Sequence, residues 1–179
     1  MSIIETKRLV LRPFREGDAE MMYRNWTFDE HVAKYCRWYP HENVEVTKEL
    51  LKMYLDEAAQ GFEYRWAITL RGGDEPIGAI DVVGVSEDGK SAKLGYVLSH
   101  KYWGQGIMTE TLKTVIRTLF RRGFTEVTAC HHADNPASGR VMEKCGMRFI
   151  GTAQAQEKFG SDKTCEVKCY SIKEGTFGA

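Results

Sequence analysis

The sequence predicts an α/β (α+β) fold in which a mixed β-sheet is flanked by helices. Short apolar segments bounded by glycine, proline and charged turns recur along the chain and predict strands. Longer segments with apolar residues every three or four positions lie among them and predict amphipathic helices. The 179 residues, 42% of them hydrophobic, suit a single domain over residues 1–179 with a sizeable core.

The first half of the chain predicts a strand, a helical region, one long helix and three strands. Asn43 suits the N-cap of the long helix, and Gly61 suits its end. Turn signals at Arg71–Asp74 and Glu87–Lys90 separate the strands. In chain order we expect a strand within 3–14, helical spacing over 21–26, an irregular aromatic stretch over 26–41, a helix over 44–59, and strands over 64–70, 76–85 and 92–99.

The second half predicts two helices and three strands. Asn135 is a good N-cap, Pro136 suits the first helical position, and Gly146 suits a helix stop. We expect a helix from about Gly104 to near Gly123, a strand over 126–131, a helix after Asn135, and strands over 149–157 and 165–172 joined by a turn at 160–162.

Composition excludes several classes of protein. Lys plus Arg and Asp plus Glu both number 25, so the net charge is zero and argues against a nucleic-acid binder that works by bulk charge. No apolar run approaches the ~20 residues of a membrane span, and no signal peptide opens the chain, so we expect a cytoplasmic protein without a membrane partner. The odd number and scattered spacing of the five cysteines predict reduced thiols, and the absence of a Cys-x-x-Cys pair predicts no metal site; the cysteines are Cys36, Cys130, Cys145, Cys165 and Cys169.

A glycine turn at Lys101–Gly106 separates a predicted strand from a predicted helix. Glycines let the backbone adopt conformations that side chains forbid and let a ligand approach the main chain. The first amides of a helix have no internal partner, and together with the helix dipole they form an anion site. The sequence therefore predicts a pyrophosphate on the amides between about Gly104 and Thr109. A tight connection without a ligand is the alternative explanation of the turn alone.

The motifs resemble those of the GNAT N-acetyltransferases. Tyr102-Trp103-Gly104-Gln105-Gly106 with Thr109-Glu110 is similar to that family's pyrophosphate loop, Arg/Gln-x-x-Gly-x-Gly/Ala, with Lys101 in the Arg/Gln position. Asn135-x-x-Ser138, followed by Glu143-Lys144-x-Gly146, resembles the second motif of the family. Both motifs and the opening Glu5–Pro13 resemble the branch that contains the ribosomal-protein N-terminal acetyltransferases.

The resemblance implies a GNAT fold with a mostly antiparallel central sheet that splays at the acyl-CoA site. The strand before the glycine turn and the strand at Val127–Cys130 part there, and the pantetheine arm pairs with the backbone like an extra strand. The implied cosubstrate is acetyl-CoA, without a metal. The implied contacts are Tyr96, Val97, Leu98, Trp103, Gly104, Gln105, Gly106, Ile107, Met108, Thr109, Asn135 and Ser138.

The implied reaction is direct attack of a neutral primary amine on the thioester in a ternary complex. The resemblance implies that the main-chain amide near Leu98 polarises the thioester carbonyl. Many GNAT enzymes use a Tyr as the acid to the departing sulfur, but that position is Met142 here. Ser138 is therefore the candidate acid, with an ordinary helix position as its structural alternative.

The general base is less defined. A Glu that many relatives carry in the central strand is replaced here by Lys93. Asp81 lies in an otherwise apolar strand and is one candidate base. His131 follows a strand, and because an imidazole has a near-neutral intrinsic pKa, it is the other candidate base. Asp81 could instead be a solvent-facing strand residue. Tyr170, a water chain, or no dedicated base are the remaining alternatives.

Three functions remain open. In the first two, the acceptor amine is either a protein N-terminus, as on ribosomal proteins, or a small amine such as a polyamine, an amino acid derivative or an antibiotic. In the third, the protein is a sensor that binds acyl-CoA without catalysis. The aromatic stretch over 26–41 is either core packing or, as the resemblance implies, part of the acceptor wall. Relatives are monomers or homodimers, and we expect one of these states and no direct nucleic-acid partner.

Overall fold

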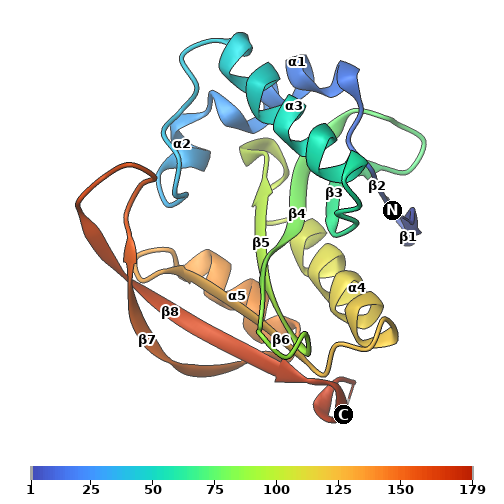
Figure 1. Cartoon of the computed structure of the whole chain (residues 1–179), viewed down its shortest axis with the longest axis vertical. Coiled ribbons are helices and arrows are strands. Elements are labelled where there is room, and N and C mark those ends of the chain that lie inside the picture. Colours follow the sequence, from blue (N-terminus) through green and yellow to red (C-terminus); the bar gives the residue numbers. More distant parts are fainter. Residues whose placement is uncertain (1, 179) are drawn as a thin grey trace. The chain divides into compact units, whose positions relative to one another are not determined.

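The computed structural model describes residues 2–178, whose eight strands form one sheet in the order β1-β2-β3-β4-β5-β6-β8-β7 (Figure 1). The strands are β1 (Ile4–Glu5), β2 (Leu9–Arg12), β3 (Arg65–Leu70), β4 (Pro76–Val85), β5 (Ser91–Leu98), β6 (Glu126–His132), β7 (Arg148–Gln156) and β8 (Thr164–Lys173). The helices are η1 (Glu16–Asp18), α1 (Ala19–Met22), η2 (Tyr23–Thr27), α2 (Glu30–Ala33), α3 (Val44–Ala59), η3 (His100–Tyr102), α4 (Ile107–Arg121), α5 (Pro136–Lys144) and η4 (Glu174–Thr176). The β5–β6 pair is parallel and β1–β2, β2–β3, β3–β4, β6–β8 and β7–β8 are antiparallel, which confirms the mixed, mostly antiparallel sheet.

The strongest local signals give the elements that were predicted. The helix expected over 44–59 is α3, and the side chain of Asn43 caps it by accepting hydrogen bonds from the amides of Glu45 and Val46 at 3.0 and 3.3 Å. The strand expected over 76–85 is β4. The cap of α3 and the apolar run of β4 are therefore local signals that the structure confirms.

The N-terminal strand and the first helix differ from the prediction. The strand expected within 3–14 is a hairpin of β1 and β2, whose turn is closed by the Leu9 amide donating to Thr6 Oγ1 at 2.9 Å. The helical spacing over 21–26 becomes α1 followed by the π-helix η2, and the irregular stretch after it contains the short helix α2. The hairpin turn contains polar Lys7 and Arg8 and no glycine or proline, so no local turn signal predicts it.

The chain divides into two compact units. Unit 1 comprises the residues up to Lys34, Tyr39–Asp81 and Tyr96–Ile107, and unit 2 comprises Tyr35–Trp38, Val82–Gly95 and the residues from Met108 onward. In unit 1, β2, β3 and β4 bury one apolar layer, and α1 packs against α3 (Figure 1). Its fully buried members include Leu9, Leu11, Trp66, Ile68 and Ile80.

A buried guanidinium ties the start of unit 1 together. The side chain of Arg12 is almost fully buried and pairs with the carboxylates of Asp18 and Asp74, each at 2.8 Å. It also donates to the carbonyl oxygens of Pro13 and Asp74. Because a buried charge is costly unless it is paired and hydrogen-bonded, this network fixes β2 against η1 and the β3–β4 turn.

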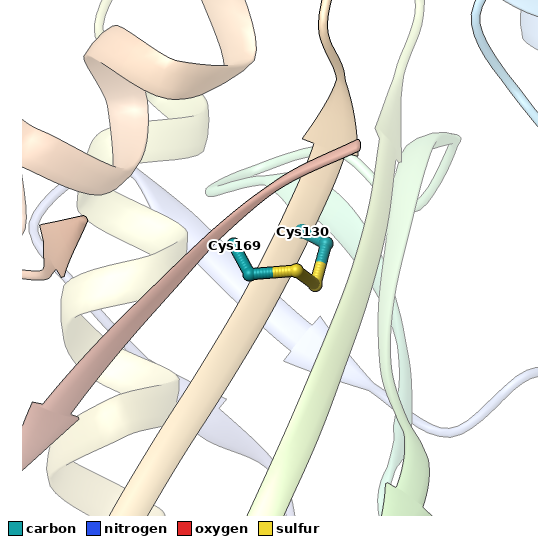
Figure 2. Close-up of a disulfide and its surroundings, with 2 residues drawn as sticks. All are labelled: Cys130 and Cys169. Atoms are coloured by element: carbon teal, nitrogen blue, oxygen red, sulfur yellow. A yellow bond between two sulfur atoms is a disulfide. The ribbon is translucent and has the colours of Figure 1, made fainter. Parts of the chain in front are cut away.

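In unit 2, α4 buries a stripe of apolar side chains, and β6 is paired with β8 over its whole length. The buried stripe comprises Leu112, Val115, Ile116 and Leu119. Cys130 and Cys169 lie directly opposite in the β6–β8 register and form a disulfide (Figure 2). The expectation that all five thiols are reduced is therefore wrong for this pair, whereas Cys36, Cys145 and Cys165 remain thiols.

The segment Tyr35–Trp38 is attached to the turn of the β7–β8 hairpin, within unit 2. Lys158 Nζ donates to the carbonyl oxygens of Cys36 and Trp38 at 2.7 and 3.2 Å. The Phe159 amide donates to the Arg37 carbonyl oxygen at 2.6 Å, and the Arg37 guanidinium lies 4.6 Å from the Phe159 ring centroid. Three successive carbonyls of the segment are thus held by two adjacent residues of the hairpin.

Among the described residues, no helix combines the length and the apolar character needed to cross a membrane.

Candidate active site

The glycine turn has the backbone conformation that the anion-site prediction requires. Gly104 and Gly106 have φ of +74° and +73°, in the left-handed region that residues with a Cβ rarely adopt. A Cβ on Gly104 would have no atom of the described residues within 4 Å, so no packing contact among them accounts for the glycine there. The turn is exposed and leads directly into α4 at Ile107, where the first helical amides lack internal partners.

Hydrogen bonds within unit 1 hold the turn in place. The Trp103 indole N–H donates to the Leu98 carbonyl oxygen at 2.8 Å, and the Gln105 side chain donates to the Lys101 carbonyl oxygen at 3.0 Å. Arg8 Nη1 donates to the Gln105 carbonyl oxygen at 3.1 Å. The turn is therefore pre-organised, and its Gln105 side chain serves the turn itself.

Arg8 adds a cation that sequence reasoning did not assign to this turn. Its Nη2 lies 3.7 Å from the position of a Cβ on Gly106, so the exposed guanidinium is beside the backbone amides. Guanidinium groups bind phosphate oxygens with paired donors. No local signal links Arg8 to Gln105, because 97 residues separate them in the sequence.

Tyr96, Val97 and Leu98 lie past the end of the parallel register of their strand. The β5–β6 register runs from Ser91–Glu126 to Leu94–Ala129, and β5 then continues for four more residues. At Gly78 of β4, an added Cβ would collide with the carbonyl oxygen of Val97, so only glycine allows this close approach. The close approach of Gly78 therefore holds the end of β5 against β4.

The side chains of Ile107 and Met108 are buried, with 3% and 6% exposure, so these residues offer only their backbone to a ligand in the turn. Thr109 is half-buried, and its carbonyl oxygen accepts from the Cys145 thiol at 3.5 Å within unit 2. Burial raises the pKa of the Cys145 thiol to about 12, so this thiol is a packing residue and not a nucleophile.

The α5 helix starts as its sequence predicts. Asn135 Oδ1 accepts from the Ser138 amide at 3.3 Å, which makes Asn135 the N-cap. Ser138 is half-buried in the first turn of α5. The capping role of Asn135 is therefore observed, and its contact with a pantetheine arm stays a prediction.

His131 is buried in unit 2 with its ring beside α5. Its Nδ1 lies 2.7 Å from the His132 carbonyl oxygen, so Nδ1 carries the proton and Nε2 offers a lone pair. Burial lowers the pKa of His131 and favours this neutral form. Within residues 2–178, Nε2 finds no hydrogen-bond partner, and a Cβ on Gly139 would lie 2.7 Å from it.

Tyr170 and Glu143 complete the surroundings of His131. The Tyr170 hydroxyl donates to Glu143 Oε1 at 3.2 Å, and its ring centroid lies 5.6 Å from that of His131. Burial and the nearby Glu143 carboxylate raise the pKa of Tyr170. The hydroxyl is therefore protonated at neutral pH and committed to the carboxylate, which weakens Tyr170 as a base.

Asp81 is a partly buried member of an ion-pair cluster in unit 1. It lies opposite Arg65 in the β3–β4 register, and Arg65 Nε donates to its Oδ2 at 3.0 Å. Arg65 also pairs with Glu57 and lies 3.9 Å from the Tyr54 ring centroid. Burial raises the pKa of Asp81 although Arg65 opposes the shift. Asp81 is thus neither solvent-facing nor free to act alone.

The structure places these candidates in two separate groups. Unit 1 holds the end of β5, the glycine turn and Asp81, whereas unit 2 holds Thr109, His131, Asn135 and Ser138. Sequence reasoning found the turn from its glycines and the α5 start from its capping residues. It missed Arg8 and Gly139, because their contacts join distant parts of the sequence.

Comparisons with known proteins bear on the family and the fold of this chain. Residues 8–148 match the family model of the acetyltransferase (GNAT) domain. The chain is 29% identical over 174 residues to the uncharacterized N-acetyltransferase YoaA of Bacillus subtilis (strain 168), covering 95% of this chain and 96% of the relative. It is 28% identical over 159 residues to the uncharacterized N-acetyltransferase p20 of Bacillus licheniformis, with 88% and 89% covered.

Solved structures share the fold. A GNAT-family acetyltransferase from Bacillus anthracis superposes with a TM-score of 0.84 at 22% identity, covering 97% of this chain and 99% of that one. RimL, a ribosomal L7/L12 alpha-N-protein acetyltransferase in complex with coenzyme A, gives 0.81 at 21%, covering 96% and 98%. The microcin C7 self-immunity acetyltransferase MccE, in complex with acetyl-CoA and AMP, gives 0.80 at 17%, covering 94% and 93%. Because the family model matches most of the length of this chain, the chain belongs to the GNAT family of N-acetyltransferases.

Proposed function

We propose that this chain transfers the acetyl group of acetyl-CoA to a protein N-terminus, of the kind that ribosomal proteins present, by direct attack in a ternary complex. The observation that carries the cosubstrate assignment is the exposed turn with two left-handed glycines and the Arg8 guanidinium at the start of α4. The name of RimL, a structural neighbour, supports a protein N-terminus as acceptor. We further propose a single GNAT domain over residues 1–179, cytoplasmic, as a monomer or homodimer.

In this proposal the turn binds the pyrophosphate of acetyl-CoA. The amides from Gly104 to Thr109 act as donors, and Arg8 supplies a charge that the backbone lacks. The pantetheine arm pairs with the backbone from Tyr96 to Leu98, where β5 has run past its register with β6. No metal is needed, since backbone dipoles and one guanidinium neutralise the phosphates.

The proposed chemistry requires no covalent intermediate. The amine nitrogen attacks the thioester carbon, the C–S bond breaks, and the amine proton leaves while the thiolate is protonated. The Leu98 amide is the proposed donor to the carbonyl oxygen, and the Ser138 hydroxyl is the proposed donor to the departing sulfur. Both are neutral donors whose effect comes from being held in place before the reaction.

Of the two candidate bases, His131 is better supported than Asp81. Asp81 is held by Arg65 in an ion pair, and removing its charge would leave Arg65 with Glu57 as its carboxylate partner. His131 is neutral and its Nε2 has no partner among the described residues. Because Nε2 is covered by α5, we propose that His131 receives the proton through an intervening water and not directly from the amine.

A small-amine acceptor is the second candidate. MccE, a structural neighbour, is named a microcin C7 self-immunity acetyltransferase in complex with acetyl-CoA and AMP, and the small molecule AMP in that complex favours a small acceptor. A sensor that binds acyl-CoA without turnover is the third candidate, favoured by Lys93, which is exposed at the position where many relatives carry a Glu.

The test is thiol release from acetyl-CoA with peptides that start with Ser or Ala and with a panel of small amines. Turnover on the peptides alone supports the proposal, and turnover on one small amine alone replaces it with the second candidate. Binding of acetyl-CoA without turnover on either panel supports the sensor. Ser138→Ala should lower kcat by about 100-fold while leaving the KM for acetyl-CoA unchanged, and Ser138→Thr, which keeps the hydroxyl, should restore most of it.

A further inference from the structure

We infer that Asp29, His31 and His100 form a binding site for a divalent transition-metal ion on the surface of unit 1. One ligand atom from each of these side chains can be chosen so that all lie within 4.8 Å of one another. Asp29 and His31 stand at the start of α2, and His100 is the first residue of η3. This site does not depend on the proposed acetyl transfer.

The three side chains are held near one another by contacts of different kinds. Asp29 Oδ1 accepts from the His31 amide at 2.9 Å and lies 3.3 Å from His31 Nδ1. The rings of His31 and His100 stack with centroids 5.1 Å apart, and the His100 ring lies 4.6 Å from that of Trp103. Two segments that are distant in sequence therefore present their imidazoles to one side of Asp29.

The donor set determines which ions would bind. Neutral imidazole nitrogens suit zinc, copper, nickel and cobalt, whereas magnesium and calcium prefer oxygen ligands and keep more water. Two imidazoles and one carboxylate form a common three-ligand set that leaves a coordination position open. Both imidazoles are exposed, and the His31 side chain has 75% exposure, so the rings can turn toward an ion without disturbing the core.

A matched control is present in the same chain. His132 and Asp134 also form a histidine–carboxylate pair, with Nδ1 and Oδ2 3.9 Å apart, but no second imidazole joins them in a cluster of ligand atoms within residues 2–178. If exposed histidine and aspartate bound metal non-specifically, Asp134→Asn would weaken binding as much as Asp29→Asn. Asn at position 29 retains the capping oxygen for α2 and removes only the charge.

The experiment is a titration of the tag-free, full-length protein with Co²⁺ and with Zn²⁺ against a chromophoric chelator. We expect stoichiometric binding near one ion per chain that excess Mg²⁺ does not displace. Co²⁺ should partly quench the fluorescence of the four tryptophans, because one of them, Trp103, lies beside His100. Loss of an outer partner of a metal ligand typically costs about 10- to 100-fold in affinity, so His31→Gln and Asp29→Asn should each weaken binding by at least about tenfold. Asp134→Asn should leave the affinity unchanged.

Two outcomes would overturn the inference. One is unchanged affinity in His31→Gln, which alters an exposed side chain and should fold normally. The other is a sulfur-to-cobalt charge-transfer band that disappears when Cys36 or Cys165 is replaced, since it would assign the ion to thiolates instead. His100→Gln is the supporting variant, and its circular dichroism spectrum should match that of the parent protein.

Discussion

Replacing Gly104 with alanine isolates the backbone requirement of the glycine turn. A Cβ at this position lies more than 4 Å from the atoms of residues 2–178 that could clash with it, so the substitution creates no clash with that part of the chain. The cost comes from φ, which is +74° and disfavours an L-residue by about 1–2 kcal/mol. If the free turn relaxes into another conformation to avoid this cost, CoA can bind only after the turn returns to its original conformation. The cost of that return corresponds to a CoA affinity about 5- to 30-fold weaker.

The assay is calorimetric titration of CoA into Gly104→Ala, with Gly89→Ala as the control. Gly89 has φ of +70° and also has open space around its Cβ position, but it lies in the β4–β5 turn. Because a cost that the turn escapes by relaxing appears in binding and not in unfolding, Gly104→Ala should lose CoA affinity with little loss of unfolding free energy. Gly89→Ala should keep its CoA affinity. Wild-type affinity in Gly104→Ala without any loss of unfolding free energy would refute the assignment, since the turn would then have relaxed with no effect on CoA.

Asparagine at position 104 separates two physical causes. Asn tolerates a left-handed φ better than Ala, but it carries a Cβ as Ala does. If strain in φ weakens binding, Gly104→Asn should recover most of the affinity. If the Cβ blocks the approach of the pyrophosphate, the two variants should bind CoA equally poorly.

The other predictions concern charge, pH and the disulfide. Arg8→Gln should weaken CoA binding by up to about fivefold at low salt, because an exposed charge contact contributes at most about 1 kcal/mol, and high salt should reduce the difference. Burial lowers the pKa of His131, so as the pH falls the unfolded state binds a proton at this side chain before the folded state does. The unfolding free energy should therefore be constant above about pH 6.5 and fall below it, and the fall should be less steep in His131→Gln. Thiol titration after denaturation should give three free cysteines without reductant and five with it, and Cys169→Ser should lose up to about 4 kcal/mol of stability for a loop that spans 39 residues.

Each of these predictions has an outcome that would contradict it. Equal losses of CoA affinity in Arg8→Gln and in its neighbour Lys7→Gln would mean that general charge, and not the contact with Gln105, is responsible. The same pH dependence of unfolding in His131→Gln and the parent protein would show that His131 does not titrate in this range. Five free thiols in the absence of reductant would show that Cys130 and Cys169 are not bonded.

Elements with strong local signals could be predicted from the sequence. The long helix α3 has its own N-cap in Asn43, and α5 has a cap in Asn135 followed by Pro136, so neither needs tertiary contacts to define its start. The glycine turn was predicted because its two glycines stand between a strand pattern and a helix pattern.

Features that depend on register or on distant contacts could not be predicted in the same way. The Cys130–Cys169 bond requires the β6–β8 register, which no local pattern specifies. The Nε2 atom of His131 has space beside α5 only because position 139 is a glycine. This contact joins β6 to α5, which are separate elements of the sequence. The odd number of cysteines pointed to free thiols because counting says nothing about which strands become neighbours.

The attachment of Tyr35–Trp38 to the β7–β8 hairpin uses main-chain carbonyls for three of its hydrogen bonds. Any residue at positions 36, 37 or 38 presents the same carbonyl to Lys158 and to the Phe159 amide. The path of this segment can therefore be inherited while its side chains diverge. Randomising Lys158 should remove two of these three hydrogen bonds, whereas randomising Arg37 should remove its side-chain contact with Phe159 and leave all three carbonyls in place.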